Sequence, residues 1–347
     1  MFQGMGKATI PLNNDLGFDA STVDVMVLSH AHIDHSGLIP KLVKEGFRGK
    51  IYCTPATKDL TGILLEDSAH IQENEVRYVN KKRAAEGQPY VQPLYTLDDA
   101  KKATERLTEV KYNEWKTIEQ GVELLFTDAG HIIGSACVHL RITDNGKTES
   151  LTFSGDIGRY RDIILRSPDI FPQADYIIME STYGNSLHEM QFTTPNHLLE
   201  WVERTCVQKK GKLIIPAFSV GRTQEILFAL NQLELENRLP KVDYFLDSPL
   251  SIEATDIIKS YHHKYCTGCK SNSTHNCFMI LHGFYFINKP GLPVSCNCCN
   301  HTNKNTNKQV VQRSNVSVRM FCIVLSSMRK YFNQRSGIKH TLSLIII

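Results

Sequence analysis

The stretch Ser29–Gly37, S-H-A-H-I-D-H-S-G, places three histidines and one aspartate within six residues. An apolar run, Val23–Leu28, precedes it and predicts a buried strand, because the run is short, β-branched and almost free of polar residues. Histidines two positions apart at the end of a strand can point to the same side. We therefore expect His30 and His32 to converge on one metal ion.

Asp34 and His35 fall on the turn into a predicted helix and can face a second metal ion beside the first. Neutral imidazole nitrogen and carboxylate oxygen are the ligands of hydrolytic zinc sites, which leave a position open for water. A lone histidine is more often a packed or a surface residue, but four ligand-type side chains at this density are rare by chance. The motif predicts a metal centre with hydrolytic chemistry.

The distribution of charge divides the chain near Tyr261. All 36 acidic residues lie within residues 1–261, together with 28 of the 39 lysines and arginines, which gives this part a net charge of −8. Residues 262–347 contain 11 lysines and arginines, no acidic residue and seven of the ten cysteines. A folded domain of that length normally carries charges of both signs. The composition of the second part is therefore not typical of a folded domain.

The sequence shows no sign of export or of membrane insertion. Its first residues, M-F-Q-G-M-G-K-A, lack the apolar core of a signal peptide, and no run approaches the ~18 apolar residues that span a bilayer. Cys53, Cys137 and Cys206 are scattered in apolar contexts, which suits a reducing compartment. We expect a soluble cytoplasmic protein.

The pattern up to residue 190 predicts an α/β fold. Helical spacing follows the motif at 38–43, continues from 58 to 85 and returns at 97–107. Strands are expected at 50–54, 122–127, 136–142, 151–154 and 176–179. The turn Asp144–Gly146, D-N-G, lies between two of these strands and predicts a hairpin.

From Thr193 the pattern alternates between helix and strand. We expect helices at 197–207, 222–235 and 252–260, and strands at 212–218 and 242–246. This alternation is typical of a parallel α/β unit with crossover helices.

Three further stretches each place a ligand-type or acid/base side chain just after a predicted strand. They are His131 in T-D-A-G-H-I-I-G-S, Asp156 in F-S-G-D-I-G and Glu180 in I-M-E-S-T-Y-G-N. Functional residues gather on such loops, although each of these taken singly would more often be structural. Together with the first motif they predict the rim of an active site.

The ordered series H-A-H-I-D-H, G-H, S-G-D and E-S-T-Y-G resembles the metallo-β-lactamase fold, in its β-CASP branch of nucleic-acid-processing nucleases. That branch includes the mRNA 3′-end cleavage endonuclease and bacterial ribonucleases. The stretch Ile215–Glu225, I-P-A-F-S-V-G-R-T-Q-E, is similar to the β-CASP domain inserted in this branch. The resemblance runs from Met1 to about Tyr261 and implies a four-layered αβ/βα sandwich followed by the beginning of a β-CASP α/β domain.

Three segments are expected from this resemblance and from the charge distribution. Residues 1–190 would form an N-terminally incomplete metallo-β-lactamase domain. Residues 191–261 would form a partial β-CASP domain. Residues 262–347 would be a cysteine-rich basic tail that is disordered or non-native.

The resemblance implies a role for each site residue. One zinc ion would be held by His30, His32 and His131, a second by Asp34 and His35, and Asp156 would bridge the two. Two zinc ions about 3.5–4 Å apart can activate water for in-line attack on phosphorus and stabilise charge on the phosphate oxygens. The candidate catalytic carboxylates are Asp34, Asp156 and Glu180, the last of which works in the family with a later histidine in proton transfer to the leaving group.

The implied substrate is RNA, cut by endonuclease or exonuclease action. Its phosphates could be received by Arg159, Arg161 and Arg222, although single arginines on loops are more often solvated. A homodimer is a further possibility.

The sequence departs from the family pattern in three respects. Family members begin with several strands and an aspartate-bearing D-C-G-type turn before a segment like F-Q-G, whereas this sequence begins at M-F-Q-G. We therefore expect one sheet to lose strands and to expose an edge. The β-CASP domain stops early, and the two late histidines of the family lack a counterpart, since His282 in I-L-H-G-F comes too soon after Glu180.

The tail contains two C-x-x-C pairs, Cys266 with Cys269 and Cys296 with Cys299, separated by 26 residues. The spacing is somewhat longer than the ~15–20 residues of zinc ribbons. One interpretation is a structural zinc knuckle. The other is a tail that is not a selected coding sequence, which the absence of acidic residues and of amphipathic periodicity favours.

Three functions remain open on the sequence alone. The first is a zinc-dependent phosphodiester hydrolase acting on RNA. The second is a catalytically impaired or inactive zinc-binding fragment of such a nuclease. The third, a small-molecule hydrolase of the metallo-β-lactamase fold, is weakened by E-S-T-Y-G and by the β-CASP-like segment.

Overall fold

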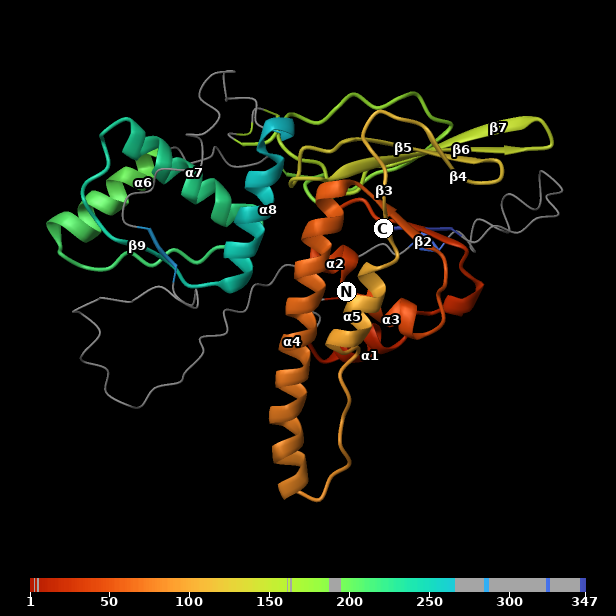
Figure 1. The fold of residues 1–347 in the computed structure, drawn as a ribbon, viewed down its shortest axis with the longest axis horizontal. Coiled ribbons are helices and arrows are strands. Elements are labelled where there is room, and N and C mark those ends of the chain that lie inside the picture. The colour runs from red at the N-terminus through yellow and green to blue at the C-terminus, as the bar shows by residue number, and fades with distance from the viewer. Residues whose placement is uncertain are drawn as a thin grey trace.

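The computed structural model describes residues 1–2, 4, 6–160, 162, 164–186, 195–265, 284–286, 323–324 and 344–347. Two five-stranded sheets pack face to face, and helices cover the outer face of the first sheet (Figure 1). A smaller helical region with a two-stranded sheet lies beside them. The α/β sandwich expected from the sequence is confirmed.

The first sheet has the strand order β11-β12-β1-β2-β3. Its strands are β1 (Val25–Val27), β2 (Lys50–Cys53), β3 (Leu107–Glu109), β11 (Ile323–Val324) and β12 (Leu344–Ile346). β1 pairs in parallel with both β2 and β12, and β2 pairs in parallel with β3. All three residues of β1 are buried, as expected for a parallel strand that is covered on both faces.

Helices connect the parallel strands, and two of them begin at side-chain caps. α2 (Ile33–Ser36) and α3 (Ile39–Lys44) link β1 to β2, while α4 (Pro55–Ala85) and α5 (Leu97–Thr104) link β2 to β3. The Thr54 side chain accepts the Thr57 N–H at the start of α4, with proline at the first helical position. Thr96 and Asp99 form a capping box at the start of α5. The N-terminal segment adds η1 (Gly6–Ala8), α1 (Thr9–Asn14) and η2 (Ala20–Thr22).

The second sheet is mostly antiparallel, in the order β4-β5-β6-β7-β8. Its strands are β4 (Lys116–Glu119), β5 (Val122–Asp128), β6 (Ala136–Asp144), β7 (Lys147–Phe153) and β8 (Tyr176–Ile178). β8 runs parallel to β7. The predicted hairpin joins β6 to β7, where Asn145 and Gly146 take φ values of 49° and 78°. Positive φ at both central residues is the requirement of a type I′ turn.

Two apolar layers hold the sandwich together. Between the sheets, Val25, Val27 and Tyr52 of the first sheet pack against Leu124, Phe126, Val138 and Leu140 of the second. On the other side of the first sheet, Met26, Leu28 and Ile51 pack against Ile39, Leu42 and Leu65 from the helices. Each such side chain contributes about 1.5–3 kcal/mol on burial. The ends of the strands, where the polar residues lie, are thereby held in fixed positions.

The third region contains the helices after residue 194. They are α6 (Pro195–Val202), the π-helix η3 (Glu203–Gln208), α7 (Arg222–Leu235) and α8 (Pro249–Tyr265). β9 (Tyr244–Leu246) pairs in parallel with β10 (Phe284–Phe286). α8 packs against α4, and the Tyr261 hydroxyl donates to Asp59 Oδ2 at 2.8 Å.

An apolar cluster joins this region to the sandwich beside the predicted metal ligands. Its buried members are Ala31, Ala56, Leu60, Ile132, Ile133, Val220, Ala254 and Ile258. Ala31 separates His30 from His32, and Ile132 follows His131. The helices of the third region therefore border the loops that carry the predicted site.

The structure corrects three expectations. Residues 212–218 form no strand, and Ile214 and Phe218 are 85% and 83% exposed. The short strands β3 and β4 were not predicted. The sequence predicted an exposed edge in one sheet without naming a strand. In the structure β12 covers one edge of β1, because Ile347 N–H donates to the Val27 carbonyl at 2.9 Å and Ile345 to Ile347 are buried.

Most of residues 262–347 lie outside the described residues. His282 and the C-x-x-C cysteines lie outside the described residues, and so does Arg161. In the part of the chain that the structure describes, no helix is both long and apolar enough to cross a membrane.

Candidate metal centre

The predicted site residues come together where strands of the two sheets end. His30 follows β1, and His32 is the residue before α2, whose four residues include Asp34 and His35. The other members lie on the second sheet: His131 between β5 and β6, Asp156 after β7 and Glu180 after β8. Four segments that are distant in sequence thus converge on one place.

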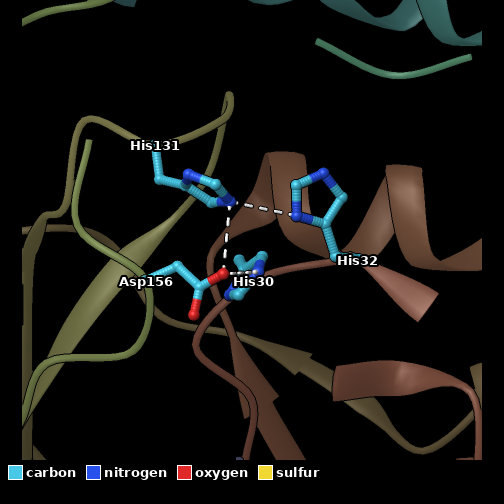
Figure 2. Close-up of side chains that lie close together, drawn as sticks. All are labelled: His30, His32, His131 and Asp156. Atoms are coloured by element: carbon cyan, nitrogen blue, oxygen red, sulfur yellow. Dashed lines mark hydrogen bonds and ion pairs between the residues drawn. The ribbon is translucent and has the colours of Figure 1, made fainter. Parts of the chain in front are cut away.

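One group consists of His30, His32, His131 and Asp156. One ligand atom from each of these side chains lies within 4.8 Å of the others (Figure 2). His131 Nε2 lies 3.0 Å from His32 Nδ1 and 3.5 Å from Asp156 Oδ2. His30 Nε2 lies 3.7 Å from the same carboxylate oxygen. Three imidazoles and one carboxylate therefore face a common point.

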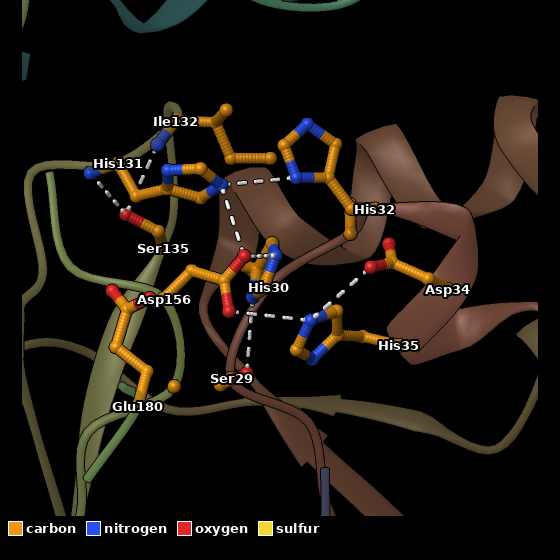
Figure 3. Close-up of polar contacts among 12 residues, drawn as sticks. Ser29, His30, His32, Asp34, His35, His131, Ile132, Ser135, Asp156 and Glu180 are labelled. Atoms are coloured by element: carbon orange, nitrogen blue, oxygen red, sulfur yellow. Dashed lines mark hydrogen bonds and ion pairs between the residues drawn. The ribbon is translucent and has the colours of Figure 1, made fainter. Parts of the chain in front are cut away.

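A second group lies on the other side of Asp156 (Figure 3). His35 Nε2 is 3.4 Å from Asp156 Oδ1 and 3.7 Å from Asp34 Oδ2. The two carboxylate oxygens of Asp156 thus face different groups, Oδ2 toward His30 and His131, and Oδ1 toward His35.

Burial keeps the histidines of the first group neutral. It lowers the pKa of His30 well below its usual value, an effect that the neighbouring His35, His32 and His131 reinforce. Burial, followed by the proximity of His131, lowers the pKa of His32 to about 4, and burial also lowers the pKa of His131. A neutral imidazole offers the lone pair that a metal ion requires.

Asp156 has the complementary charge state. Burial alone would raise its pKa, but the hydrogen bond and charge of His35, together with His131 and His32, bring the pKa below its usual value. A negative carboxylate among neutral imidazoles is the donor set of a hydrolytic metal site.

The His30 ring supplies an independent test of whether these residues fit a metal ion. Its Nε2 atom is buried and has no hydrogen-bond partner among the described residues. A buried polar atom without a partner is costly, on the order of 1–3 kcal/mol. Because this atom faces Asp156, a metal ion bound there would satisfy it, so the residues present fit a metal.

Buried serines that the sequence analysis missed support the ligand segments. The Ser36 hydroxyl donates to the carbonyl of Ala31 at 2.8 Å, and Ser135 Oγ accepts the His131 N–H at 3.0 Å. Both serines are fully buried. Each lies four residues after a ligand histidine, His32 or His131, and this spacing is the signal that could have identified them.

Glu180 lies beside the Asp156 loop and is tied to it. Its Oε1 accepts the Ile157 N–H at 2.6 Å, and its Oε2 accepts the Thr182 hydroxyl at 2.9 Å. Its own N–H donates to Ser154 Oγ at 3.0 Å. The Glu180 carboxylate therefore contacts the loop that carries Asp156.

Two of the three predicted phosphate-binding arginines can be placed. Arg222 begins α7 and forms an ion pair with Glu225. Burial raises the pKa of Glu225, while Arg222 and Arg159 oppose this rise, so both arginines lie near one carboxylate. Arg159 is exposed, and Arg222 is engaged by Glu225.

The chain matches two protein families. Residues 4–194 match the metallo-beta-lactamase superfamily, and residues 223–336 match the Beta-Casp domain. The second match runs past Tyr261, and the domain bounds expected from the sequence stay a prediction.

Curated proteins from bacteria and archaea are similar to this chain. Ribonuclease TTHA0252 of Thermus thermophilus is 36% identical over 72% of this chain and 52% of its own length. An RNase J-like protein of Methanocaldococcus jannaschii is 33% identical over 70% of this chain and 51% of its own length. Transcription termination factor FttA of Methanosarcina mazei is 32% identical over 69% of this chain and 35% of its own length.

The chain thus spans about half, or less, of the length of these relatives. The match to the superfamily covers more than half of this chain and includes every predicted ligand of the metal centre. The chain belongs to the metallo-beta-lactamase superfamily and continues into a Beta-Casp domain.

Proposed function

We propose that this chain holds two zinc ions and hydrolyses phosphodiester bonds in RNA. One zinc ion would be held by His30, His32 and His131, and the other by Asp34 and His35. Asp156 would serve both groups. The observation that carries this proposal is the division of the Asp156 carboxylate, whose Oδ2 faces His30 and His131 while its Oδ1 faces His35 at 3.4 Å.

The residues of the chain prepare the site in three ways. The neutral histidines offer lone pairs, and the ionised Asp156 balances positive charge between the two groups. Zinc, when bound, supplies an activated water and positive charge opposite the phosphate oxygens. Glu180 holds the Asp156 loop and is the candidate for proton transfer to the leaving oxygen, and Arg159 and Arg222 are candidates for binding phosphates.

RNA is proposed as the substrate because similar proteins are named ribonuclease and RNase J-like protein. We place the reaction in the cytoplasm, where RNA is available to a chain with this cysteine usage. The homodimer named in the sequence analysis is tested by the molar mass of the protein in solution.

A second candidate is a metal-binding segment without catalytic activity. Two observations favour it. The chain spans only about half of the length of its relatives, and among the described residues the second group consists of Asp34, His35 and Asp156. Such a segment would bind one zinc ion at the more complete first group.

Zinc stoichiometry separates the two candidates. Purified wild-type protein is expected to hold two zinc ions per chain, and a value of one or none supports the non-catalytic segment. Cleavage of a labelled single-stranded RNA is then compared between wild type and Asp156→Ala. Asp98→Ala, at an exposed position at the start of α5, serves as the matched control for losing one carboxylate. Equal rates for wild type and Asp156→Ala would exclude hydrolysis at this site.

A further inference from the structure

Ser29 lies directly against the metal-centre residues and is engaged through its backbone and its side chain. Its Oγ is 3.1 Å from His30 Nδ1, a contact that Figure 3 shows. Its N–H donates to the Ile347 carbonyl at 2.6 Å, and its carbonyl accepts the Ala136 N–H at 2.8 Å. Ser29 is 1% exposed and His30 is 0% exposed. The side chain therefore has little freedom to take another position.

The two ring nitrogens of His30 have different surroundings. Nδ1 faces the Ser29 hydroxyl, whereas Nε2 lacks a hydrogen-bond partner among the described residues and lies 3.7 Å from Asp156 Oδ2. A neutral imidazole carries one proton, and the nitrogen that carries it cannot bind a metal ion. With the proton on Nδ1 and donated to Ser29, the Nε2 lone pair is free on the side of Asp156.

Ser29 also contacts the loop that carries Asp156. A Cβ atom added to Gly155 would lie 3.0 Å from Ser29 Cβ and 3.1 Å from Ser29 Oγ. Gly155 has a φ of +56°, so a side chain is disfavoured there by the backbone as well. Through Ala136 at the start of β6 and Gly155 after β7, Ser29 contacts two of the segments that border ligand loops.

We propose that Ser29 is a positioning residue of the metal centre, which fixes His30 in the Nδ1–H tautomer and directs Nε2 to the metal ion. Partners of this kind orient metal-binding histidines in general, and their loss typically weakens metal binding about 10- to 100-fold. The inference rests on the proposed function only in requiring that the first group binds a metal ion.

The affinity for zinc tests this role without measuring activity. Ser29→Ala removes the hydroxyl, and Ser68→Ala removes another buried hydroxyl, which lies on α4 and accepts a hydrogen bond from Tyr95. Competition with a chromophoric chelator is expected to show zinc binding weakened about 10- to 100-fold in Ser29→Ala. Ser68→Ala is expected to lower stability but to bind zinc as the wild type does, because the hydroxyl of Ser68 bonds to Tyr95 and not to a candidate ligand.

The protonated nitrogen of His30 can be observed directly in the unsubstituted protein. NMR of metal-free wild type with isotope-labelled histidine is expected to show the His30 proton on Nδ1. This measurement remains decisive even if Ser29→Ala fails to fold.

Two results would overturn the inference. One is a proton on Nε2 of His30 in the metal-free wild type. The other is equal zinc affinity for Ser29→Ala and Ser68→Ala. Failure of the wild type to bind zinc at all would instead contradict the proposed function, so the two failures are distinguishable.

Discussion

Glu180 Oε1 accepts the backbone N–H of Ile157 at 2.6 Å, one residue after Asp156. A hydrogen bond to a charged acceptor contributes about 1.5–3 kcal/mol to stability. The Glu180 side chain thus fixes the loop of Asp156, whose two carboxylate oxygens face different groups. This contact gives Glu180 a structural role that is separate from any proton transfer.

The two roles of Glu180 can be separated by substitution. Glu180→Ala removes the acceptor and is expected to release the Asp156 loop, which lowers the zinc content of the protein. Glu180→Gln keeps an oxygen acceptor for Ile157 and is expected to keep the zinc content of the wild type while losing the ionisable group. Metal analysis after dialysis measures both variants.

Thr182→Ala is the control for Glu180, because it removes the hydroxyl that donates to Oε2 and leaves the bond to Ile157. It is expected to retain the zinc content of the wild type. If Glu180→Ala also retained two zinc ions, the anchoring role would be wrong.

The grouping of the candidate metal ligands was largely predictable, because these residues are marked by local sequence. His30, His32, Asp34 and His35 lie within one short stretch that follows β1 and enters α2, and His131 and Asp156 each follow a strand whose apolar pattern is clear. The alternation of apolar and polar residues fixes where such strands end and hence where the side chains gather. The structure brings all six together as expected.

Other features depend on partners that are far away in sequence. β12 pairs with β1 across more than 300 residues, and no local pattern indicates such a pairing. Residues 212–218 have an apolar composition typical of a strand, but they pair with no strand that the structure describes. The short strands β3 and β4 carry charged residues and were recognisable only from the sheets that they extend.

The buried side chain of His139 is expected to make the stability of the metal-free protein depend on pH. It is 2% exposed, its ring nitrogens lie 2.8 Å from Thr152 Oγ1 and 2.9 Å from Thr127 Oγ1, and burial lowers its pKa to about 4. In the unfolded chain a histidine takes up its proton near pH 6.5. Between pH 6.5 and about 4 the unfolded state therefore binds more protons, and stability falls as the pH is lowered.

The share of His139 in this loss is roughly 3 kcal/mol, since one unit of pKa corresponds to about 1.4 kcal/mol. Urea unfolding of chelator-treated protein at pH 7 and pH 4 measures it. His139→Gln is expected to lose less stability over this interval than the wild type, and His70→Gln, at an exposed position on α4, is the control for removing a surface histidine. Equal losses for His139→Gln and wild type would contradict the assignment.

The covering of β1 by β12 predicts that the last residues of the chain stabilise the sandwich. Ile346 is 2% exposed, pairs with Val27 and belongs to the apolar layer between the sheets. Ile346→Ala is expected to lower the free energy of unfolding by about 2–5 kcal/mol, as for other buried isoleucines. Ile10→Ala, at a position that is 71% exposed, is the control. Equal stability of the two variants would show that β12 does not pair with β1 in solution.

Gly158 lies where the loop of Asp156 and the loop of His131 are in close contact. Its N–H donates to the Ala129 carbonyl at 2.8 Å, and a Cβ atom at this position would lie 1.6 Å from the Gly130 carbonyl oxygen. Gly158→Ala must therefore separate the loop of Asp156 from the loop of His131. We expect weaker zinc binding together with lower thermal stability.

Gly62 provides the matched control for Gly158, because a Cβ atom there meets nothing within 4 Å and the residue lies inside α4. Gly62→Ala is expected to raise stability by about 0.5–1 kcal/mol through helix propensity and to leave zinc affinity unchanged. Thermal unfolding is expected to show lower stability for Gly158→Ala and higher stability for Gly62→Ala. Chelator competition is expected to show weaker zinc binding for Gly158→Ala alone. A Gly158→Ala protein with the zinc affinity and stability of the wild type would show that the two loops do not meet at this carbonyl.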